Sequence, residues 1–592
     1  MGMSGLYVGL SGLQTNSNSL NTTANNLSNV NTEGYVRQQV VNSDKAYNFV
    51  GTRAGTTTGQ KGLGVNIASV NHIRDFFLDL AYRKEYGRQG FYDKLYDSVY
   101  EIETQMGETD FIAGIGFQKN ITDFLESINE ISKTPGDNTA RAALVQSAIQ
   151  FIDSSKTIYK GLVNYQKNLN EEIISTVDKI NQMGEQLVTL NRAISKIETG
   201  GYETSADLRD QRDMILDELA NYCKITYNED DNGSVEVYIE GTKFADEFSY
   251  NRLATENFQG MDLVNVVWPA LNNEPLYSYT ETISTAKNTD IGALKGLLVA
   301  RGHITPTYVD ADATEPAPVA EPDAAAYPGG ETDPDYIADR EAYEDYLVLK
   351  NRYDLYQVSA GTSNLVNAIA NFDKLVSTMV IEINNIFCPE TKITSAGGTE
   401  YTVLDMDEAP VTSDGQFGFE LFTREYCDRY VVQNIDGKDY YVRNDTNNFG
   451  NVSTYTIMNL GVNQKIIQDY SRIPLTTQDG SDDYKKAEQL VKLFSRDIMK
   501  YNGSFDEMSF EEFFECMVND IANTGKVYKS MSENETTLAA QLESQRQQVM
   551  GVASDDELSN MIKFQQAYNA SSRYINVIDN MLETLINNLG VR

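Results

Sequence analysis

The sequence contains few side chains of the kinds that build metal or acid–base sites. Its two histidines, His72 and His303, stand far apart in a chain of 592 residues. Imidazole is a common general base at neutral pH and a common zinc ligand, so this scarcity excludes most sites of either kind. No HExxH motif occurs, and no nucleophile stands in a recognisable catalytic pattern. We therefore expect no catalytic residue, no bound metal and no cofactor, and we predict that the chain is not an enzyme.

The four cysteines are a second group of potentially reactive side chains. Cys223, Cys388, Cys427 and Cys516 form no CxxC pair and are widely spaced. This spacing indicates neither a zinc knuckle nor a disulfide scaffold. We expect buried free thiols.

Carboxylates are abundant, and they cluster in one segment. Six of the twelve prolines lie between Pro306 and Pro334, in a stretch that also carries eight acidic residues. These are Asp310, Asp312, Glu315, Glu321, Asp323, Glu331, Asp333 and Asp335. The ordered ligand spacing and mid-loop glycine of a calcium-binding loop are missing, so we predict a solvated acidic Pro-rich loop over residues 306–345. Asp405 and Asp407, a separate carboxylate pair, are interpreted as ordinary surface charges.

Composition excludes several classes of protein. The 48 basic and 86 acidic residues give a net charge of −38, which argues against nucleic acid as a partner. Hydrophobic residues make up 41% of the chain, enough for packed cores. No stretch approaches the roughly 18 to 20 uninterrupted apolar residues of a membrane span. The first basic residue is Arg37, so no cleavable secretory signal peptide can be read, and any export would use another route.

The two ends of the sequence carry strong helical patterns. Leucines recur every seven residues at Leu6, Leu13, Leu20 and Leu27, which is a heptad seam. Asn, Ser or Thr occupies 14 of the 19 positions from 14 to 32, so this helix has little stability of its own. An apolar stripe near the other end comprises Met561, Phe564, Tyr568, Ser571, Ile575, Ile578, Leu582, Leu585 and Leu589. We predict that the two helices pair as a coiled coil, either with each other or with copies in neighbouring subunits.

Further helices and a few strands are predicted between the termini. Helical patterns cover 162–197, where Gly200 and Gly201 end the helix, and then 206–222, 364–387, 484–501 and 510–523. Strand patterns flank Asn232-Gly233 and Asp436-Gly437, two turn signals typical of β-hairpins. The fold class is therefore mainly α with β-rich insertions (α+β), with a long-helix bundle domain and outward β-rich domains. At about 150 residues per domain the length suggests roughly four domains.

The predicted domain boundaries follow these patterns. A terminal coiled-coil assembly domain comprises 1–60 with 545–592, and a helical core domain comprises 61–225 with 360–390 and 484–544. A β-rich domain spans 226–305, the acidic loop spans 306–345, and a β-rich insertion spans 391–483.

Both terminal motifs resemble a known family. The run from Thr23 to Tyr35, TANNLSNVNTEGY, is similar to the N-terminal signature of bacterial flagellar rod, hook and hook-associated proteins. The run from Phe564 to Arg573, FQQAYNASSR, resembles the C-terminal signature of the same axial family. The interior segment 207–213, DLRDQRD, resembles the hook-associated members and has no counterpart in hook or rod proteins. Together with shorter matches, the resemblance covers about half of the chain, and it leaves the acidic loop and residues 398–480 unassigned.

The resemblance implies a function and a set of partners. It implies a structural adaptor between hook and filament, needed for filament assembly and motility, with paired terminal helices that form the inner wall of a tube. The implied partners are other copies of the chain, the hook protein, a distal junction protein or flagellin, and an export chaperone. It also implies type III export without a cleavable signal and a place in the extracellular flagellum.

The predicted assembly interface consists of residues in the two terminal helices and the turn after the first. They are Leu6, Leu10, Leu13, Leu20, Ala24, Asn25, Asn26, Leu27, Val30, Asn31, Gly34, Tyr35, Phe564, Gln565, Tyr568, Ser571, Ile575, Ile578, Leu582 and Leu585. Gly34 is a helix-stop signal. Asn25 and Asn26 are poor residues for a helix interior unless their amides gain partners, which an assembly could supply. Two alternatives remain: another axial subunit, such as a hook or distal rod protein, or a junction protein whose insertion at 398–480 binds a ligand.

Overall fold

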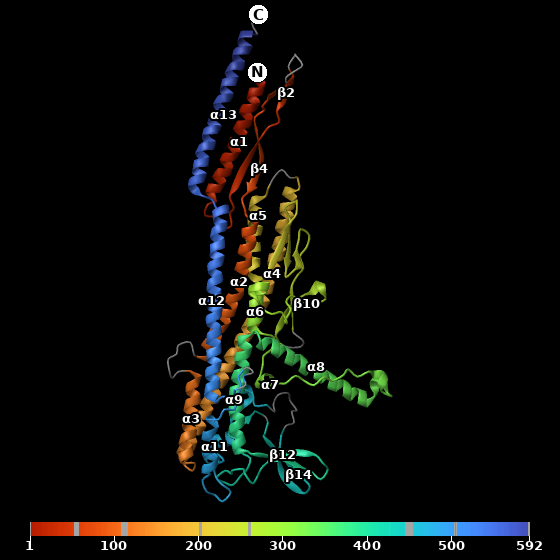
Figure 1. Cartoon of the computed structure of the whole chain (residues 1–592), viewed down its shortest axis with the longest axis vertical. Helices are drawn as coiled ribbons and strands as arrows, with labels where there is room; N and C mark the ends of the chain where they lie inside the picture. Colours follow the sequence, from red (N-terminus) through yellow and green to blue (C-terminus); the bar gives the residue numbers. More distant parts are fainter. Residues whose placement is uncertain are drawn as a thin grey trace.

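Long helices run along most of the length of a narrow molecule, and both chain termini lie at the same end (Figure 1). The structure is a computed structural model. It describes residues 2–51, 58–107, 116–200, 204–257, 262–425, 427–444, 454–501, 504 and 506–589. Gly201 and the last residues of the predicted terminal domain, 590–592, lie outside the described residues.

The helices form the framework. They are α1 (Gly2–Ser28), α2 (Phe76–Met106), α3 (Phe117–Lys133), α4 (Asn138–Glu198), α5 (Ala206–Tyr222), α6 (Ala293–Arg301), α7 (Tyr308–Ala311), α8 (Pro334–Ala360), α9 (Asn364–Phe387), α10 (Gln464–Gln468), α11 (Tyr484–Phe494), α12 (Phe510–Met550) and α13 (Ser554–Leu589). One continuous apolar core joins α2, α3, α4, α9, α11 and α12. Capping side chains fix several helix starts, such as Asp75 before α2 and the Ser509–Glu512 capping box of α12.

The strands form small antiparallel sheets beside this framework. They are β1 (Gln38–Asp44), β2 (Asn48–Gly51), β3 (Thr58–Lys61), β4 (Val65–His72), β5 (Ile225–Glu229), β6 (Val235–Ile239), β7 (Thr242–Ala245), β8 (Ala254–Asn257), β9 (Val264–Trp268), β10 (Glu274–Pro275), β11 (Glu390–Thr394), β12 (Glu400–Leu404), β13 (Phe422–Arg424), β14 (Tyr430–Ile435), β15 (Lys438–Arg443) and β16 (Leu460–Val462). The sheet orders are β1-β4, β2-β3, β5-β6-β7, β10-β9-β8, β11-β12-β15-β14 and β13-β16. The predicted fold class, mainly helical with β-rich insertions, is confirmed.

Element lengths differ from the sequence patterns in several places. Helices α5 and α9 match their predicted ranges, whereas α4 and α12 extend far beyond theirs and α11 ends at Phe494. The patterns missed α2 and α3. The buried face of α2 includes the charged residues Asp79, Arg83, Glu85 and Arg88, which obscures its pattern. Helix α3, by contrast, carries a regular apolar stripe in its sequence, namely Phe117, Ile121, Phe124, Ile128 and Ile131.

Buried amides attach the small sheets to the long helix α4. Asn191 donates to the carbonyl oxygen of Val235 at 2.8 Å and accepts from its N–H at 3.1 Å. Asn181 makes the same pair of bonds with Leu253, both at 2.9 Å. Each amide forms hydrogen bonds with the backbone N–H and C=O groups of a strand or loop that packs against the helix. These bonds fix the position of the β-rich region along α4.

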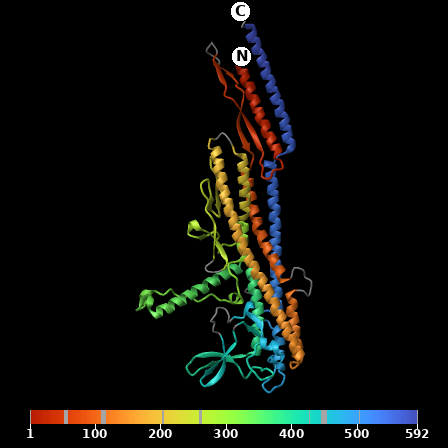
Figure 2. The same ribbon diagram turned by 180° about the vertical axis from the view of Figure 1, so that it is seen from behind.

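The predicted acidic loop over 306–345 is partly wrong. Residues 308–311 form α7, and residues from 334 onward form α8, which points away from the long body in the front view and in the view from behind (Figure 2). Asp310 is buried and receives a hydrogen bond of 2.6 Å from Arg352 on α8. The acidic composition hid this helix because its buried residues, Leu355, Tyr356 and Ser359, all lie near its C-terminal end.

The cysteines also depart from expectation. Cys223 and Cys388 are buried, but Cys427 is half-buried and Cys516 is exposed on α12, so the prediction of buried thiols is wrong for these two.

Among the helices in the described ranges, none has an apolar stretch long enough to cross a membrane.

A buried glutamate lies beneath the β-rich insertion. Glu420 is almost fully buried, accepts a hydrogen bond from the hydroxyl of Tyr455 at 2.7 Å and another from the amide of Asn384 at 3.2 Å. Burial raises the pKa of Glu420 to about 7, and the bond from Tyr455 only partly opposes this. The folded protein therefore binds a proton here at a higher pH than the unfolded chain does.

We predict that Glu420→Gln removes a pH-dependent part of the stability. A carboxyl group whose pKa is raised by folding destabilises the folded state at pH values above that pKa. This destabilisation disappears as the pH falls towards the pKa that the group has in the unfolded chain. As the pH falls from about 8 to about 5, the wild type should therefore become more stable relative to Glu420→Gln. Thermal unfolding of both proteins across this range is the measurement, with Glu408→Gln at an exposed position as the control. A constant difference would contradict the shifted pKa.

Candidate functional site

The two terminal helices lie side by side and run in opposite directions, as both views show (Figures 1 and 2). Three glycines of α1 face α13. A Cβ atom placed on Gly9 would lie 2.6 Å from Cγ1 of Ile575, and one on Gly12 would lie 2.9 Å from Oγ of Ser571. One on Gly5 would lie 3.0 Å from Cδ1 of Ile578. The helices approach so closely that larger side chains would collide with this face.

The predicted interface residues are distributed over exposed and half-buried positions. Leu10, Asn25, Val30, Asn31, Gln565, Tyr568 and Leu585 are exposed. Leu6, Leu13, Leu20, Ala24, Leu27, Gly34, Tyr35, Phe564, Ser571, Ile575, Ile578 and Leu582 are half-buried, and Asn26 is buried. The structure thus brings Ser571, Ile575 and Ile578 against α1, while several other apolar members of the set stay open to solvent.

The most deeply buried face of α1 is polar, which the leucine pattern did not predict. Beyond Gly9, the buried residues of α1 are Ser11, Thr15, Ser19, Thr23 and Asn26. This face packs against the β1–β4 ribbon, where the N–H of Val65 donates to Oγ of Ser11 at 3.2 Å. Gly64 lies against the same turn of α1, at a positive φ of 101°. A spacing of four and three residues between small polar side chains was the sequence signal for this face.

Asn26 obtains its hydrogen-bond partners from its own chain. Its amide donates to the carbonyl oxygen of Gln38 at 2.9 Å, and its carbonyl oxygen accepts from the Tyr35 hydroxyl at 2.9 Å and from the N–H of Gln38 at 3.1 Å. Gly34 allows this return of the chain with a positive φ of 75°. An assembly, which could have supplied these partners, is therefore not needed for Asn26, and Asn25 is exposed.

The segment 207–213 connects the terminal helix pair to the body, and we call it the hub segment. Asp210 accepts from the N–H of Val36 at 3.2 Å and pairs with His72 at the end of β4. The junction also includes a bond of 2.8 Å from the N–H of Arg37 to the carbonyl oxygen of Met550, at the end of α12. The two passages of the chain between the terminal part and the body, after β4 and after α12, therefore lie at one place.

Other side chains of the hub segment reach into the body. Arg209 binds Glu198 near the end of α4, with its closest contact at 2.6 Å, and Arg212 donates to the carbonyl oxygen of Gly233 at 2.6 Å. Burial raises the pKa of Glu198, but hydrogen bonds from Arg209 and Ser205 outweigh it and lower the value to about 2. The resemblance identified this segment, but its role as a connector required the structure.

A cluster of six charged side chains lies beneath the hub segment. It contains Arg74, Arg83, Arg546, Asp79, Asp213 and Asp217. Arg546, on α12, contacts both Asp79 and Asp217 at 2.8 Å and stacks on the ring of Tyr82. Burial alone would raise the pKa of Asp213, but the arginines beside it lower the pKa instead. The cluster therefore joins α2, α5 and α12 through paired charges.

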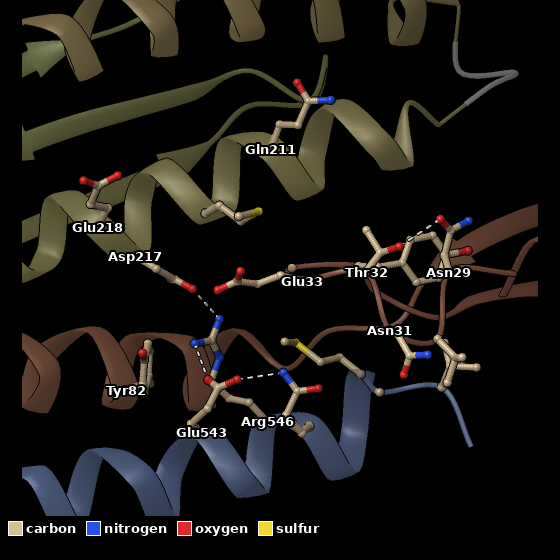
Figure 3. A pocket seen from close by; sticks show the side chains of 18 of the residues that line it. Asn29, Asn31, Thr32, Glu33, Tyr82, Gln211, Asp217, Glu218, Glu543 and Arg546 are labelled. Atoms are coloured by element: carbon tan, nitrogen blue, oxygen red, sulfur yellow. Dashed lines mark hydrogen bonds and ion pairs between the residues drawn. The ribbon is translucent and has the colours of Figure 1, made fainter. Parts of the chain in front are cut away.

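A cavity of about 710 Å³ lies between residues 29–35, α5 and the end of α12. Figure 3 shows Glu33 and Asp217 pointing into this space from opposite sides, with Arg546 and Glu543 on the third wall. Within the described part of the chain, no group of three His, Cys, Asp or Glu side chains is arranged to hold a metal ion. The arrangement is suited to connecting the terminal helix pair to the body through polar contacts.

Three family models match successive parts of the chain. "Flagella basal body rod protein" matches residues 6–35, which include α1 and the turn at Gly34. "Flagellar hook-associated protein FlgK helical domain" matches residues 101–312, which include the hub segment. "Flagellar basal body rod FlgEFG protein C-terminal" matches residues 543–589, essentially α13. All three describe components of the bacterial flagellum.

Relatives resemble the chain over nearly its whole length. Flagellar hook-associated protein 1 of Bacillus subtilis is 25% identical over 574 residues, covering 95% of this chain and 94% of the relative. The protein of the same name from Escherichia coli is 25% identical over 576 residues, covering 95% of each. The solved structure of the flagellar hook junction protein FlgK from Burkholderia pseudomallei shares the fold, with a TM-score of 0.50 and 12% identity over 79% of this chain and 99% of that one. The chain is thus similar to proteins named flagellar hook-associated protein 1 over nearly its whole length.

We predict that Gly9→Val separates the terminal helices without unfolding the body. The new side chain would collide with Ile575, and overpacking of this kind costs about 1 to 3 kcal/mol. Amide hydrogen exchange should accelerate across α1 and α13 and stay unchanged in α4. Gln14→Val introduces the same side chain at an exposed position of α1 and is the control. Equal exchange in both variants would mean that the close approach is not needed.

We also predict that Arg546→Met loosens α12 from α2 and α5. Removing one partner of buried ion pairs costs about 3 to 5 kcal/mol, and we expect the lower end because Arg74 and Arg83 still contact Asp79 and Asp217. Urea unfolding followed by circular dichroism measures the change, with exposed Lys529→Met on the same helix as the control. If Arg546→Met lowers the free energy of unfolding no more than Lys529→Met does, the cluster contributes no more to stability than exposed ion pairs do.

Proposed function

We propose that the chain is a structural subunit of the bacterial flagellum that joins the hook to the filament and is needed for filament assembly and motility. Support comes from the relatives named hook-associated protein 1, which align over almost the whole chain, and from the matched helical domain. The observation that carries the mechanism is the pairing of α1 and α13 at one end of a long body. We propose no enzymatic activity for it.

The terminal helix pair is the part that packs against neighbouring subunits in this proposal. Several apolar side chains of the pair are exposed in the single chain, among them Tyr7 at 62%, Leu10 at 47%, Met581 at 57%, Leu585 at 49% and Ile586 at 69%. Large apolar side chains gathered on one exposed element are a usual feature of contact surfaces. The pair, roughly 1–60 with 545–592, serves as the assembly domain, and the β-rich regions are directed outward.

The remaining assignments follow from this role. Neighbouring copies, the hook protein and a filament-side protein, either a distal junction protein or flagellin, are the proposed contacts. Export is proposed to proceed through the flagellar type III apparatus with the help of a chaperone, to an extracellular position. The weak helix formers of α1 support this route, because that segment unfolds easily when it is not paired.

We predict that Leu585→Asp blocks incorporation into the flagellum while leaving the monomer folded. In the single chain Leu585 is exposed, so the charge costs little there, but in a packed interface it would be buried without a partner. Electron microscopy of cells carrying this variant should show hooks without filaments, and the purified protein should keep its circular dichroism spectrum. Val348→Asp, at an exposed apolar position on α8 outside the terminal pair, is the matched control and should support normal filaments. Filaments on the Leu585→Asp cells would count against the assembly face.

A further inference from the structure

The cavity of about 710 Å³ at the foot of the terminal helix pair adjoins a second hollow of about 540 Å³. Residues of the turn 29–35 line both of them. Residues 550–552, which come shortly before α13, line the first, and the hub segment contributes to the second. The two hollows therefore form one recessed surface at the point where the terminal pair meets the body, and we call it the joint surface. Figure 3 shows its first part.

The joint surface is strongly acidic. Among its described lining residues Arg546 is the single cation, and Arg37, which follows the turn, lines neither hollow. Asp210, Asp217 and Glu543 already have basic partners. Three further carboxylates are exposed and form no ion pair with any described residue, namely Glu33, Asp207 and Glu218. The surface therefore keeps a negative potential after its own ion pairs are counted.

The lining also offers aromatic and apolar area. Tyr82 and Tyr86 stack with their ring centres 5.3 Å apart, and the guanidinium carbon of Arg546 lies 4.3 Å from the centre of the Tyr82 ring. Val30 and Met214 are exposed members of the same lining. Carboxylates beside tyrosines suit an arginine, because a guanidinium group can pair with an acid and lie on an aromatic ring.

Helix α13 carries a cation of this kind. Its two basic residues, Lys563 and Arg573, are exposed, and neither forms an ion pair with a described residue. Ile562 lies eleven positions before Arg573 and Val577 four positions after it, so these exposed apolar residues share one helix face with the arginine. This face of α13 thus complements the joint surface in charge and in apolar character.

Arg573 cannot reach the joint surface of its own chain. It lies 19 positions after Ser554, where α13 begins, and this corresponds to about 28 Å along a helix. Because α13 leads away from the body, Arg573 lies well beyond the hollows (Figure 1). Only another copy can bring this face to the joint surface.

We propose that Arg573 of one copy inserts into the joint surface of a neighbouring copy and pairs with Glu33, while the apolar residues beside it pack on Val30 and Met214. This inference rests on the proposed function, because it assumes that copies assemble through their terminal pairs. The contact joins two different surfaces and displaces the copies along their length by about 28 Å. It leaves one free surface at each end of a joined pair, so it repeats into a ring or a helix and does not stop at a dimer.

Cysteine cross-linking within isolated flagella tests the contact. The chain carries Glu33→Cys and Arg573→Cys in a background where half-buried Cys427 and exposed Cys516 are replaced by serine. A short bismaleimide should then produce a ladder of covalent oligomers of this chain, since every copy offers both halves of the contact. Chains with only one of the two new cysteines should give no ladder. Arg573→Cys combined with Glu171→Cys, at an exposed position of α4, should give none either.

Charge exchange tests whether the ion pair matters. Arg573→Glu and Glu33→Arg should each lower the number of filament-bearing cells at least about tenfold, because like charges then face each other in the contact. The two changes together should restore filaments. Arg573→Glu with Glu171→Arg has the same net charge and should not restore them. Circular dichroism of each purified variant checks that it is folded.

The outcomes separate this contact from the proposed function. Three results would each overturn the contact alone: an incorporated double-cysteine chain without a ladder, wild-type filaments in both single charge variants, and no rescue when the charges are exchanged. A cross-link from Glu33→Cys to a different protein in place of the ladder would also overturn it. Absence of the wild-type chain from isolated flagella would overturn the proposed function and the contact together.

Discussion

Paired charges at the end of the hub segment hold three helices of the body together, next to the point where the terminal helix pair joins it. Taking arginine and aspartate side chains out of water is costly, and the cost is recovered only if each charge finds a partner in good geometry. Arg546 satisfies this condition with Asp79 on α2 and Asp217 on α5, so one side chain of α12 fixes the relative position of three helices. Apolar packing between these helices is less directional than the ion pairs, which therefore add a fixed point to the relative position of the helices. The terminal helix pair is therefore attached to a body in which the relative positions of α2, α5 and α12 are fixed.

The same residues connect that body to the terminal pair. Asp210 and Asp213 are neighbours on α5, yet Asp210 binds Val36 and His72 on the terminal side, whereas Asp213 binds Arg74 at the start of the body. A short run of alternating charges therefore serves two interfaces from one helix turn. This explains why the hub segment is rich in charge although much of it is buried.

Much of the architecture could be predicted from local patterns, because α5, α9 and the hairpins at Asn232-Gly233 and Asp436-Gly437 carry their own signals. Terminal pairing was also expected from the two apolar stripes. The features that could not be predicted are those that depend on contacts between residues far apart in the sequence. The burial of Ser11 and Thr15 is set by the β1–β4 ribbon. The helix α8 inside an acidic segment is held by the contact of Arg352 with Asp310 and by the burial of Leu355 and Tyr356. The division of the candidate interface residues into inward and outward faces could not be predicted, because it depends on how α1, α13 and the β1–β4 ribbon pack together.

The antiparallel pairing of the two ends has a consequence for the order of events during synthesis. Gly9 precedes the whole body in the order of synthesis, whereas its partner Ile575 follows the body. A ribosome that has produced the whole body still holds α1 without its neighbour, so closure of the pair reports that translation has passed α13. A chain that stops before α13 would leave the glycine face of α1 and its weakly helical sequence without the neighbour that packs against them.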